Sequence, residues 1–201
     1  MVTRKYKCAV AILIAAVLGA DTLWAATPTE QVKATVDRVM EILKDKKLQG
    51  EAKRAERRER LRQVILPRFD FAEMAKRSLG THWNRNPTRQ KEFISVFAEL
   101  LEDAYTGKVE AAKGEKVLYL NGHTDQSLAE VKTKVVSAKG EETSINYKMH
   151  PVGSEWKVYD VLIENISMVN NYRSQFNRVL ANASFDELLK KLKEKNLRSD
   201  T

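Results

Sequence analysis

The sequence predicts an α+β fold, with a four-stranded antiparallel sheet covered on one face by several helices. Four short segments rich in β-branched and aromatic residues follow one another between residues 116 and 163. Segments with apolar residues at helical spacing precede and follow them. Residues 156–176 begin as a strand and end as a helix, which we expect to fold back over the sheet and leave an apolar crevice.

The four predicted strands alternate between apolar and polar residues. The predicted strands are residues 116–120, 128–137, 143–149 and 156–163, with turns at Asn121-Gly122, Lys139-Gly140 and Gly153-Ser154. In the second strand, Val131 and Val135 alternate with lysines, and in the third strand Ile145 and Tyr147 alternate with polar residues. One face of the sheet is therefore apolar and needs cover from the helices.

Capping residues mark the predicted helix starts. They are Thr27 with Glu30, Asp70 with Glu73, Asn86-Pro87 before the longest helix, Ser167, and Ser184 with Glu187. The second helix, from about Glu51 to Pro67, is highly charged. Its segment RRERLR, residues 57–62, either contacts anionic lipid headgroups or forms a solvated outer helix face.

Residues 1–26 have the pattern of a secretory signal peptide, and residues 27–201 are predicted to form a single domain. Three basic residues precede the apolar run CAVAILIAAVLGA, which is too short to span a bilayer as a mature anchor. The alternative is an uncleaved N-terminal anchor. The only cysteine, Cys8, would leave with the signal peptide, so the exported domain would have neither a thiol nor a disulfide.

The exported chain remains basic. Removing residues 1–25 takes away three cations and one anion, so the formal net charge falls from +8 to +6. For an exported protein, this charge favours an anionic membrane surface, or an acidic protein partner on one, over nucleic acid. The alternative is that the lysines and arginines are scattered over a solvated surface.

No catalytic or metal-binding motif is evident. The sequence has no nucleophile elbow, phosphate-binding glycine loop, histidine pair or Cys/His cluster, so we expect no cofactor, no metal and no enzymatic activity. Asp160, a carboxylate inside a predicted strand, has two interpretations. It is an acid or base in an exported enzyme, or a structural carboxylate near the corner between strand and helix, hydrogen-bonded to Arg173 or to backbone donors.

Several motifs of the sequence belong together. They are Leu66-Pro67-Arg68-Phe69-Asp70-Phe71, Gly80-x-x-Trp83, the long helix after Pro87, Trp156-Lys157-Val158-Tyr159-Asp160-Val161, and Ile166-Ser167-x-Val169-x-Asn171-Tyr172-Arg173-x-Gln175-Phe176. These motifs resemble the MlaC or toluene-tolerance family of periplasmic phospholipid-binding proteins, which serve ABC-type lipid transport systems. The resemblance covers essentially the whole mature chain and extends to hopanoid-associated members. Asn165 stands where the family usually has glycine, and asparagine also tolerates a left-handed backbone.

The resemblance implies a monomeric periplasmic lipid carrier with a pocket between a curved sheet and its helices. Acyl chains of a phospholipid or hopanoid would lie inside this pocket. The implied partners are an inner-membrane lipid ABC transporter or other lipid exporter, and an outer-membrane lipoprotein complex.

We predict twelve residues at this pocket. Eleven apolar or aromatic residues would line it, and each has ordinary core packing as its alternative role. They are Phe93, Phe97, Leu101, Val131, Val135, Tyr147, Val161, Ile163, Met168, Tyr172 and Phe176. The twelfth residue, Arg173, either contacts the headgroup or forms a structural ion pair.

Overall fold

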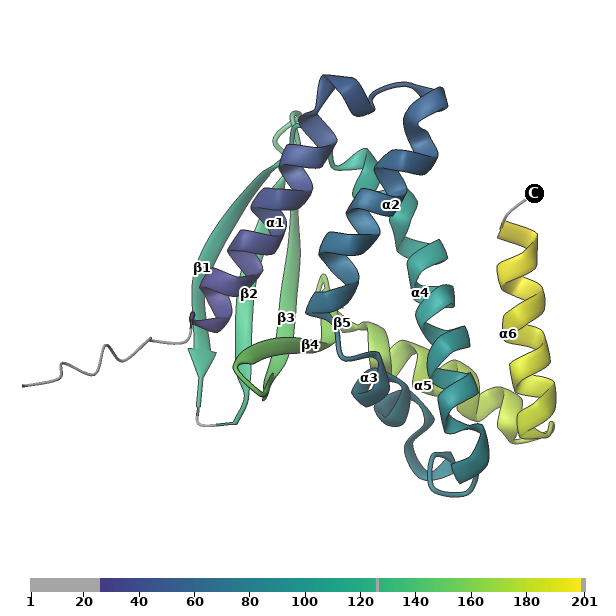
Figure 1. Ribbon diagram of the computed structural model, residues 1–201. Coiled ribbons are helices and arrows are strands. Elements are labelled where there is room, and N and C mark those ends of the chain that lie inside the picture. Colours follow the sequence, from purple (N-terminus) through teal and green to yellow (C-terminus); the bar gives the residue numbers. More distant parts are fainter. Residues whose placement is uncertain (1–25, 126, 200–201) are drawn as a thin grey trace, which may run out of the picture.

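The computed structural model describes residues 26–125 and 127–199 (Figure 1). The predicted signal peptide, apart from its last residue, lies outside the described residues. Therefore the division of the chain into a signal peptide and one domain stays a prediction. The α-helices are α1 (Pro28–Lys44), α2 (Arg54–Ile65), α3 (Phe71–Leu79), α4 (Gln90–Ala111), α5 (Met168–Leu180) and α6 (Phe185–Ser199). Short 3₁₀ turns flank several of them: η1 (Lys46–Leu48), η2 (Glu51–Lys53), η3 (Leu66–Arg68), η4 (Gly80–His82) and η5 (Pro87–Arg89).

Two of the predicted capping boxes are confirmed, and a third forms only by half. At the start of α1, the Glu30 backbone N–H donates to Thr27 Oγ1 at 3.2 Å, and the Thr27 N–H donates to Glu30 Oε2 at 2.7 Å. The box between Ser184 and Glu187 has the same two bonds. At α3, Asp70 accepts from the N–H of the residue three positions on, but its own N–H donates to a backbone oxygen of the sheet. This bond joins the start of α3 to the sheet.

The sheet has five antiparallel strands in the order β1-β2-β3-β4-β5, where four were predicted. The strands are β1 (Lys116–Thr124), β2 (Ala129–Val136), β3 (Glu142–Val152), β4 (Glu155–Ile163) and β5 (Ile166–Ser167). Val131 pairs with Tyr147, and Ile145 pairs with Ile163, so the predicted apolar face is continuous across β2, β3 and β4. The added strand, β5, is a two-residue edge strand.

The predicted turn at Asn121-Gly122 is wrong, because β1 continues through these residues to Thr124. The register of β1 against β2 shifts between Leu120 and His123, which places a β-bulge at this point. A Cβ atom at Gly122 would lie 2.2 Å from the backbone oxygen of Glu130, so only glycine fits here. The glycine in the sequence therefore marks a close approach of two strands instead of a turn.

A tight hairpin joins β4 to β5 through Glu164 and Asn165. Both residues have positive φ, 49° and 63°, and Ile163 pairs with Ile166 on either side of them. Two-residue hairpins of the I′ type require positive φ at both central positions. The expectation that Asn165 tolerates a left-handed backbone is thus confirmed, and Ser167, two residues on, caps α5 by accepting from the Asn170 N–H at 3.0 Å.

Asp160 holds the corner between β4 and α5. It is 5% exposed and accepts hydrogen bonds from Ser167 Oγ at 2.6 Å and from the Val169 backbone N–H at 3.1 Å. The predicted structural carboxylate is therefore present, with a hydroxyl and a backbone donor as its partners and not Arg173. These bonds fix the direction in which α5 leaves the sheet.

The helices stack outward from the sheet in the view of Figure 1, with α1 across the strands, then α2 and α4, and α6 farthest away. Helix α1 packs on β2 and α2, α3 packs on α5 and β4, and α4 packs on α3 and α6. The buried apolar residues form two clusters. The larger joins the sheet to α3, α4, α5 and α6 and to Val32 of α1, and the smaller joins α1, η1 and α2 around Leu43, Leu48 and Leu61.

Candidate functional site

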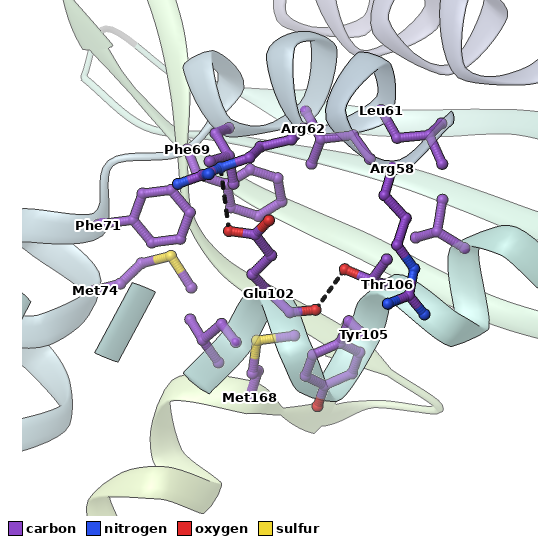
Figure 2. Close-up of a pocket in the computed structure, with 14 residues that line it drawn as sticks. Arg58, Leu61, Arg62, Phe69, Phe71, Met74, Glu102, Tyr105, Thr106 and Met168 are labelled. Carbon is purple, nitrogen blue, oxygen red and sulfur yellow. Dashed lines mark hydrogen bonds and ion pairs between the residues drawn. The ribbon is translucent and has the colours of Figure 1, made fainter. Parts of the chain in front are cut away.

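A pocket of about 100 Å³ lies where the two apolar clusters meet (Figure 2). Its walls come from α2, η3, α3, α4 and the first residue of α5. The lining residues are Arg58, Leu61, Arg62, Ile65, Leu66, Phe69, Phe71, Met74, Leu101, Glu102, Tyr105, Thr106, Val109 and Met168.

The apolar walls of the pocket follow from helical periodicity. On α4, Leu101, Tyr105 and Val109 recur every four residues and share one face. On α2, Leu61 and Ile65 are spaced in the same way and face them. Met74 of α3, which is fully buried, contributes to the inner surface. Such a lining favours an apolar ligand.

Three charged side chains mark the open end of the pocket, which we call the mouth. They are Arg58 and Arg62 of α2 and Glu102 of α4, and their side chains are 41%, 50% and 28% exposed. Arg58 and Arg62 are four residues apart and therefore lie on the same face of α2 as Leu61 and Ile65. In Figure 2 the Glu102 carboxylate points toward Arg62, while Arg58 reaches the opposite side near Thr106 and Tyr105.

Ion pairs connect α2 to α4 along what we call the α2–α4 seam, which consists of Arg57, Arg58, Arg62, Glu102 and Glu110. Arg57 Nη2 lies 2.7 Å from Glu110 Oε1, and Arg58 Nε lies 2.9 Å from Glu110 Oε2. Arg62 Nε lies 3.3 Å from Glu102 Oε2. The two helices are thus joined by charged contacts beside the apolar pocket, of which the Arg57–Glu110 pair is mostly buried and the Arg62–Glu102 pair is partly exposed.

The two carboxylates of the seam differ in how well their charge is stabilised. Burial acts to raise the pKa of Glu110, but the hydrogen bonds and charges of Arg58 and Arg57 outweigh it and hold that pKa below its usual value. Burial raises the pKa of Glu102 above its usual value, and Arg62 offsets this only in part, because Asp103, Glu59 and Glu99 repel its charge. The ionised form of Glu102 is therefore less well stabilised than that of Glu110.

Comparison with known proteins identifies the family. The family model described as MlaC protein matches residues 33–194. The chain belongs to the MlaC family.

Individual relatives agree with this assignment. The chain is 22% identical over 140 residues to the intermembrane phospholipid transport system binding protein MlaC of Haemophilus influenzae, a match that covers 67% of this chain. The match spans 65% of the length of that curated relative. The fold is similar to that of a phospholipid-binding protein from Ralstonia solanacearum solved in complex with a phospholipid. That match has a TM-score of 0.77 and 25% identity, and covers 88% of this chain and 100% of the other.

Two of the predicted site residues of this MlaC-family chain, Leu101 and Met168, line the pocket. Four others form a packed aromatic cluster beside it. The Phe97 ring centroid lies 5.3 Å from that of Tyr172 and 5.7 Å from those of Phe93 and Phe176. Burial in this cluster raises the pKa of Tyr172 to about 12. These four residues do not line the pocket, and their contact with a ligand stays a prediction.

The predicted site residues of the sheet also lie outside the pocket lining. Val131 and Val161 are buried in the larger cluster, and Val135, Tyr147 and Ile163 are half-buried on the strands. Their contact with a ligand likewise stays a prediction.

Arg173 lies away from the mouth. It is exposed, and its guanidinium packs against Gly80, whose added Cβ would lie 2.8 Å from Arg173 Nη2. Among the described residues it forms no ion pair, so the predicted structural ion pair is absent. The contact joins two of the family motifs, Gly80-x-x-Trp83 and the segment that contains Arg173.

Sequence reasoning missed the contribution of α2 to the pocket. The available signal was the spacing of Arg58, Leu61, Arg62 and Ile65, which puts two arginines and two aliphatic residues on one helix face. Arginine can bury its aliphatic stem beside apolar surface while its charged end stays in water, so this mixture is compatible with a pocket mouth.

Residues 26–125 and 127–199 contain no group of His, Cys, Asp and Glu side chains that could hold a metal ion. Within the same residues, no helix is both long and apolar enough to span a bilayer.

Proposed function

We propose that this protein is a periplasmic carrier that holds the acyl chains of a phospholipid in the pocket between α2, α3, α4 and α5. The observation that carries the proposal is the apolar pocket with a charged mouth, in a fold similar to that of a phospholipid-bound protein. Family membership and the name of the Haemophilus influenzae relative support a role in moving phospholipid between membranes. Hopanoid remains the alternative ligand.

The physical need for such a carrier follows from the hydrophobic effect. Each methylene removed from water is worth about 0.8 kcal/mol. A diacyl lipid with ~30 methylenes would therefore face a cost of ~24 kcal/mol to cross water unaided. A pocket lined by Leu61, Met74 and Leu101 replaces the membrane interior with another apolar surround, so that transfer becomes nearly thermoneutral.

The pocket must widen to accept acyl chains. Its volume of about 100 Å³ is below the ~300–1,000 Å³ that small-molecule sites usually have. Helix α2 is the wall we expect to move, because single-turn segments flank it at both ends and the ion pair that holds it to α4 at the mouth, Arg62–Glu102, is partly exposed. Exposed ion pairs exchange with water at little cost.

We place the exchange partners at the two membranes. An inner-membrane lipid ABC transporter and an outer-membrane lipoprotein complex would load and unload the carrier, which the predicted signal peptide would export to the periplasm. The net charge of +6 expected after cleavage suits approach to an anionic membrane surface. We assign no catalytic role to Asp160, because both of its carboxylate oxygens accept hydrogen bonds, one from the Ser167 hydroxyl and one from the Val169 backbone N–H.

Native mass spectrometry tests the proposal. Protein purified from a bacterial host without detergent should carry one phospholipid per chain, and delipidated protein should take up phospholipid from vesicles. Hopanoid-containing vesicles form a second arm, and preferential uptake of hopanoid would replace phospholipid as the ligand. A protein that is isolated without lipid and loads from neither kind of vesicle would overturn the carrier proposal.

A pocket-filling variant locates the site. Thr106→Trp places a large ring into the pocket from α4 and should reduce phospholipid uptake at least tenfold. The matched control is Leu118→Trp on β1, whose side chain is exposed and does not line the pocket. Uptake by Thr106→Trp equal to that of the control would exclude this pocket as the lipid site.

A further inference from the structure

We infer that Met168, in the wall of the pocket, is a reversible oxidation site that reacts with peroxides when no lipid covers it. This inference rests on the proposed function and deepens it, because it adds a form of regulation to the same pocket. A peroxide in the exported compartment would reduce lipid uptake by unloaded protein, and bound lipid would protect the loaded protein.

The four methionines of the described chain differ in two properties, pocket lining and exposure. Met168 lines the pocket and keeps 8% of its surface exposed, whereas Met74 lines the pocket and is fully buried. Met40 is half-buried on α1, Met149 is fully buried on β3, and neither lines the pocket. Among the described residues, Met168 is therefore the methionine that combines solvent access with a place in the pocket wall (Figure 2).

The pocket has room for a peroxide molecule. A cavity holds one water molecule once its volume reaches roughly 10–15 Å³. The volume of this pocket is about 100 Å³, and hydrogen peroxide is only slightly larger than water. At the mouth, the side chains of Arg62 and Glu102 are 50% and 28% exposed, so the pocket opens to solvent. Peroxide can therefore reach the thioether of Met168.

Methionine suits a wall that must widen, and it brings a reactive sulfur with it. Its unbranched side chain has three rotatable bonds and adapts to irregular spaces. The only cysteine of the sequence is Cys8, within the predicted signal peptide. Oxidation of the predicted exported chain at sulfur would therefore fall on methionine.

The reaction is a transfer of one oxygen atom. A lone pair of the thioether sulfur attacks one oxygen of hydrogen peroxide, the O–O bond breaks, and an S–O bond forms. The hydroxide that leaves takes the proton of the new S–OH group, which gives a sulfoxide and water. Sulfur is thereby oxidised and the peroxide reduced by two electrons. The sulfoxide is polar, whereas the neighbouring lining residues Leu101 and Met74 are apolar, so acyl chains should bind less well.

Timed oxidation with and without bound phospholipid tests the inference. Delipidated protein and protein loaded from phosphatidylglycerol vesicles are treated with hydrogen peroxide, and the sulfoxide at each methionine is counted in proteolytic peptides by mass spectrometry. In delipidated protein, Met168 should react faster than Met149. In loaded protein, the rate at Met168 should fall about tenfold, because a bound lipid covers the pocket wall. Met40 is the control, and its rate should not depend on lipid because it lies outside the pocket.

A second measurement connects the oxidation to lipid uptake. Delipidated wild type treated with peroxide should take up about tenfold less phospholipid, as for a polar group buried without a partner. Treatment with the two methionine sulfoxide reductases, one for each epimer, should restore the uptake.

Met168→Leu keeps a similar volume without the reactive sulfur, so peroxide should not reduce its uptake. Met40→Leu is the matched control and should lose uptake as wild type does. Each protein is compared with its own uptake before peroxide, so an effect of the substitution itself cancels. Thermal unfolding checks that each treated protein stays folded.

The outcomes separate the two proposals. An untreated wild type that takes up no phospholipid contradicts the carrier function itself. A Met168 that reacts no faster than Met149, or equally fast with and without bound lipid, overturns the oxidation site and leaves the carrier standing. A loss of uptake by peroxide-treated Met168→Leu equal to that of wild type overturns it too, because the damage then lies at another residue.

Discussion

The two halves of α4 face very different neighbours. In the first half, Phe93 and Phe97 are fully buried in the packed aromatic cluster with Tyr172 and Phe176. In the second half, the residues from Leu101 to Val109 face α2 across a cavity, under a row of ion pairs. One continuous apolar stripe on α4 therefore faces a packed core at one end and the pocket at the other.

The difference between the halves arises from what lies opposite α4. Rings from α5 and α6 interlock with the first half and fill the space. Opposite the second half, α2 presents Arg58 and Arg62 beside Leu61 and Ile65. The charged ends of the arginines stay near water, so α2 cannot pack closely onto α4, and a gap remains beneath them. Arginine on an otherwise apolar helix face can therefore keep a pocket open.

Truncation of one apolar residue in each region offers the largest test of this contrast. Phe97→Ala should lower the free energy of unfolding by ~3–5 kcal/mol, because a fully buried ring leaves a cavity. Ile65→Ala at the pocket wall should cost only ~1 kcal/mol, because one side of Ile65 already faces empty space. Urea unfolding measures both, with unchanged m values as the check. Equal decreases in the free energy of unfolding would mean that the pocket wall is as tightly packed as the aromatic cluster.

The sequence was sufficient to predict most of the fold. Alternation in β2 and β3 and the capping patterns at Thr27, Ser167 and Ser184 arise from local rules that act over a few residues, and the structure confirms them. The failures came from contacts distant in sequence. Gly122 has the sequence pattern of a turn, because nothing local indicates that the Glu130 backbone lies against it.

The pocket was harder to predict for a related reason. Periodicity identifies the buried face of a helix but does not distinguish a filled core from a lined cavity. It therefore selected Phe93 and Phe97 together with Leu101, although only Leu101 lines the pocket. The hollow depends on the packing distance of α2, which is set by the size and hydration of its arginines and cannot be read from α4.

One carboxylate fixes a helix in each part of the molecule, Asp160 at the start of α5 and Glu110 between α2 and α4. We expect their contributions to the free energy of unfolding to differ. Asp160→Ala should lower the free energy of unfolding by ~2–3 kcal/mol, because it leaves the buried Val169 N–H and the Ser167 hydroxyl without their charged acceptor. Ser167→Ala is the partial control and should cost about 1 kcal/mol. Thermal and urea unfolding measure both. A loss below 1 kcal/mol for Asp160→Ala would show that the corner does not depend on this carboxylate.

Glu110 is the corresponding residue of the seam, and its contribution should depend on pH. Glu110→Gln should cost ~1–2 kcal/mol at pH 7, because Arg57 and Arg58 lose their shared partner. The native pKa lies below the usual value of 4.5, so this contribution is present above pH 4.5 and is lost as the pH falls through the native pKa. The difference in the free energy of unfolding between wild type and Glu110→Gln should therefore disappear at acidic pH.

Glu102→Gln should have the opposite effect on stability at pH 7 from Glu110→Gln. Because the native pKa of Glu102 is raised, its ionisation at rising pH costs stability, and the variant should be as stable as wild type or more stable at pH 7. Urea unfolding from pH 3 to pH 7 measures both variants. Parallel pH profiles for Glu110→Gln and Glu102→Gln would contradict the distinction between the two carboxylates.

The smallest expected effect concerns a polar defect in the packed region. The Tyr119 hydroxyl oxygen, on β1 beside Thr133, is buried without a hydrogen-bond partner among the described residues. Burial raises the pKa of Tyr119 accordingly. Tyr119→Phe removes a polar group whose burial is uncompensated, so it should raise the free energy of unfolding by up to ~1 kcal/mol, measured by urea unfolding. A decrease of that size would mean that the hydroxyl is hydrogen-bonded in solution, and that water reaches the sheet side of the core.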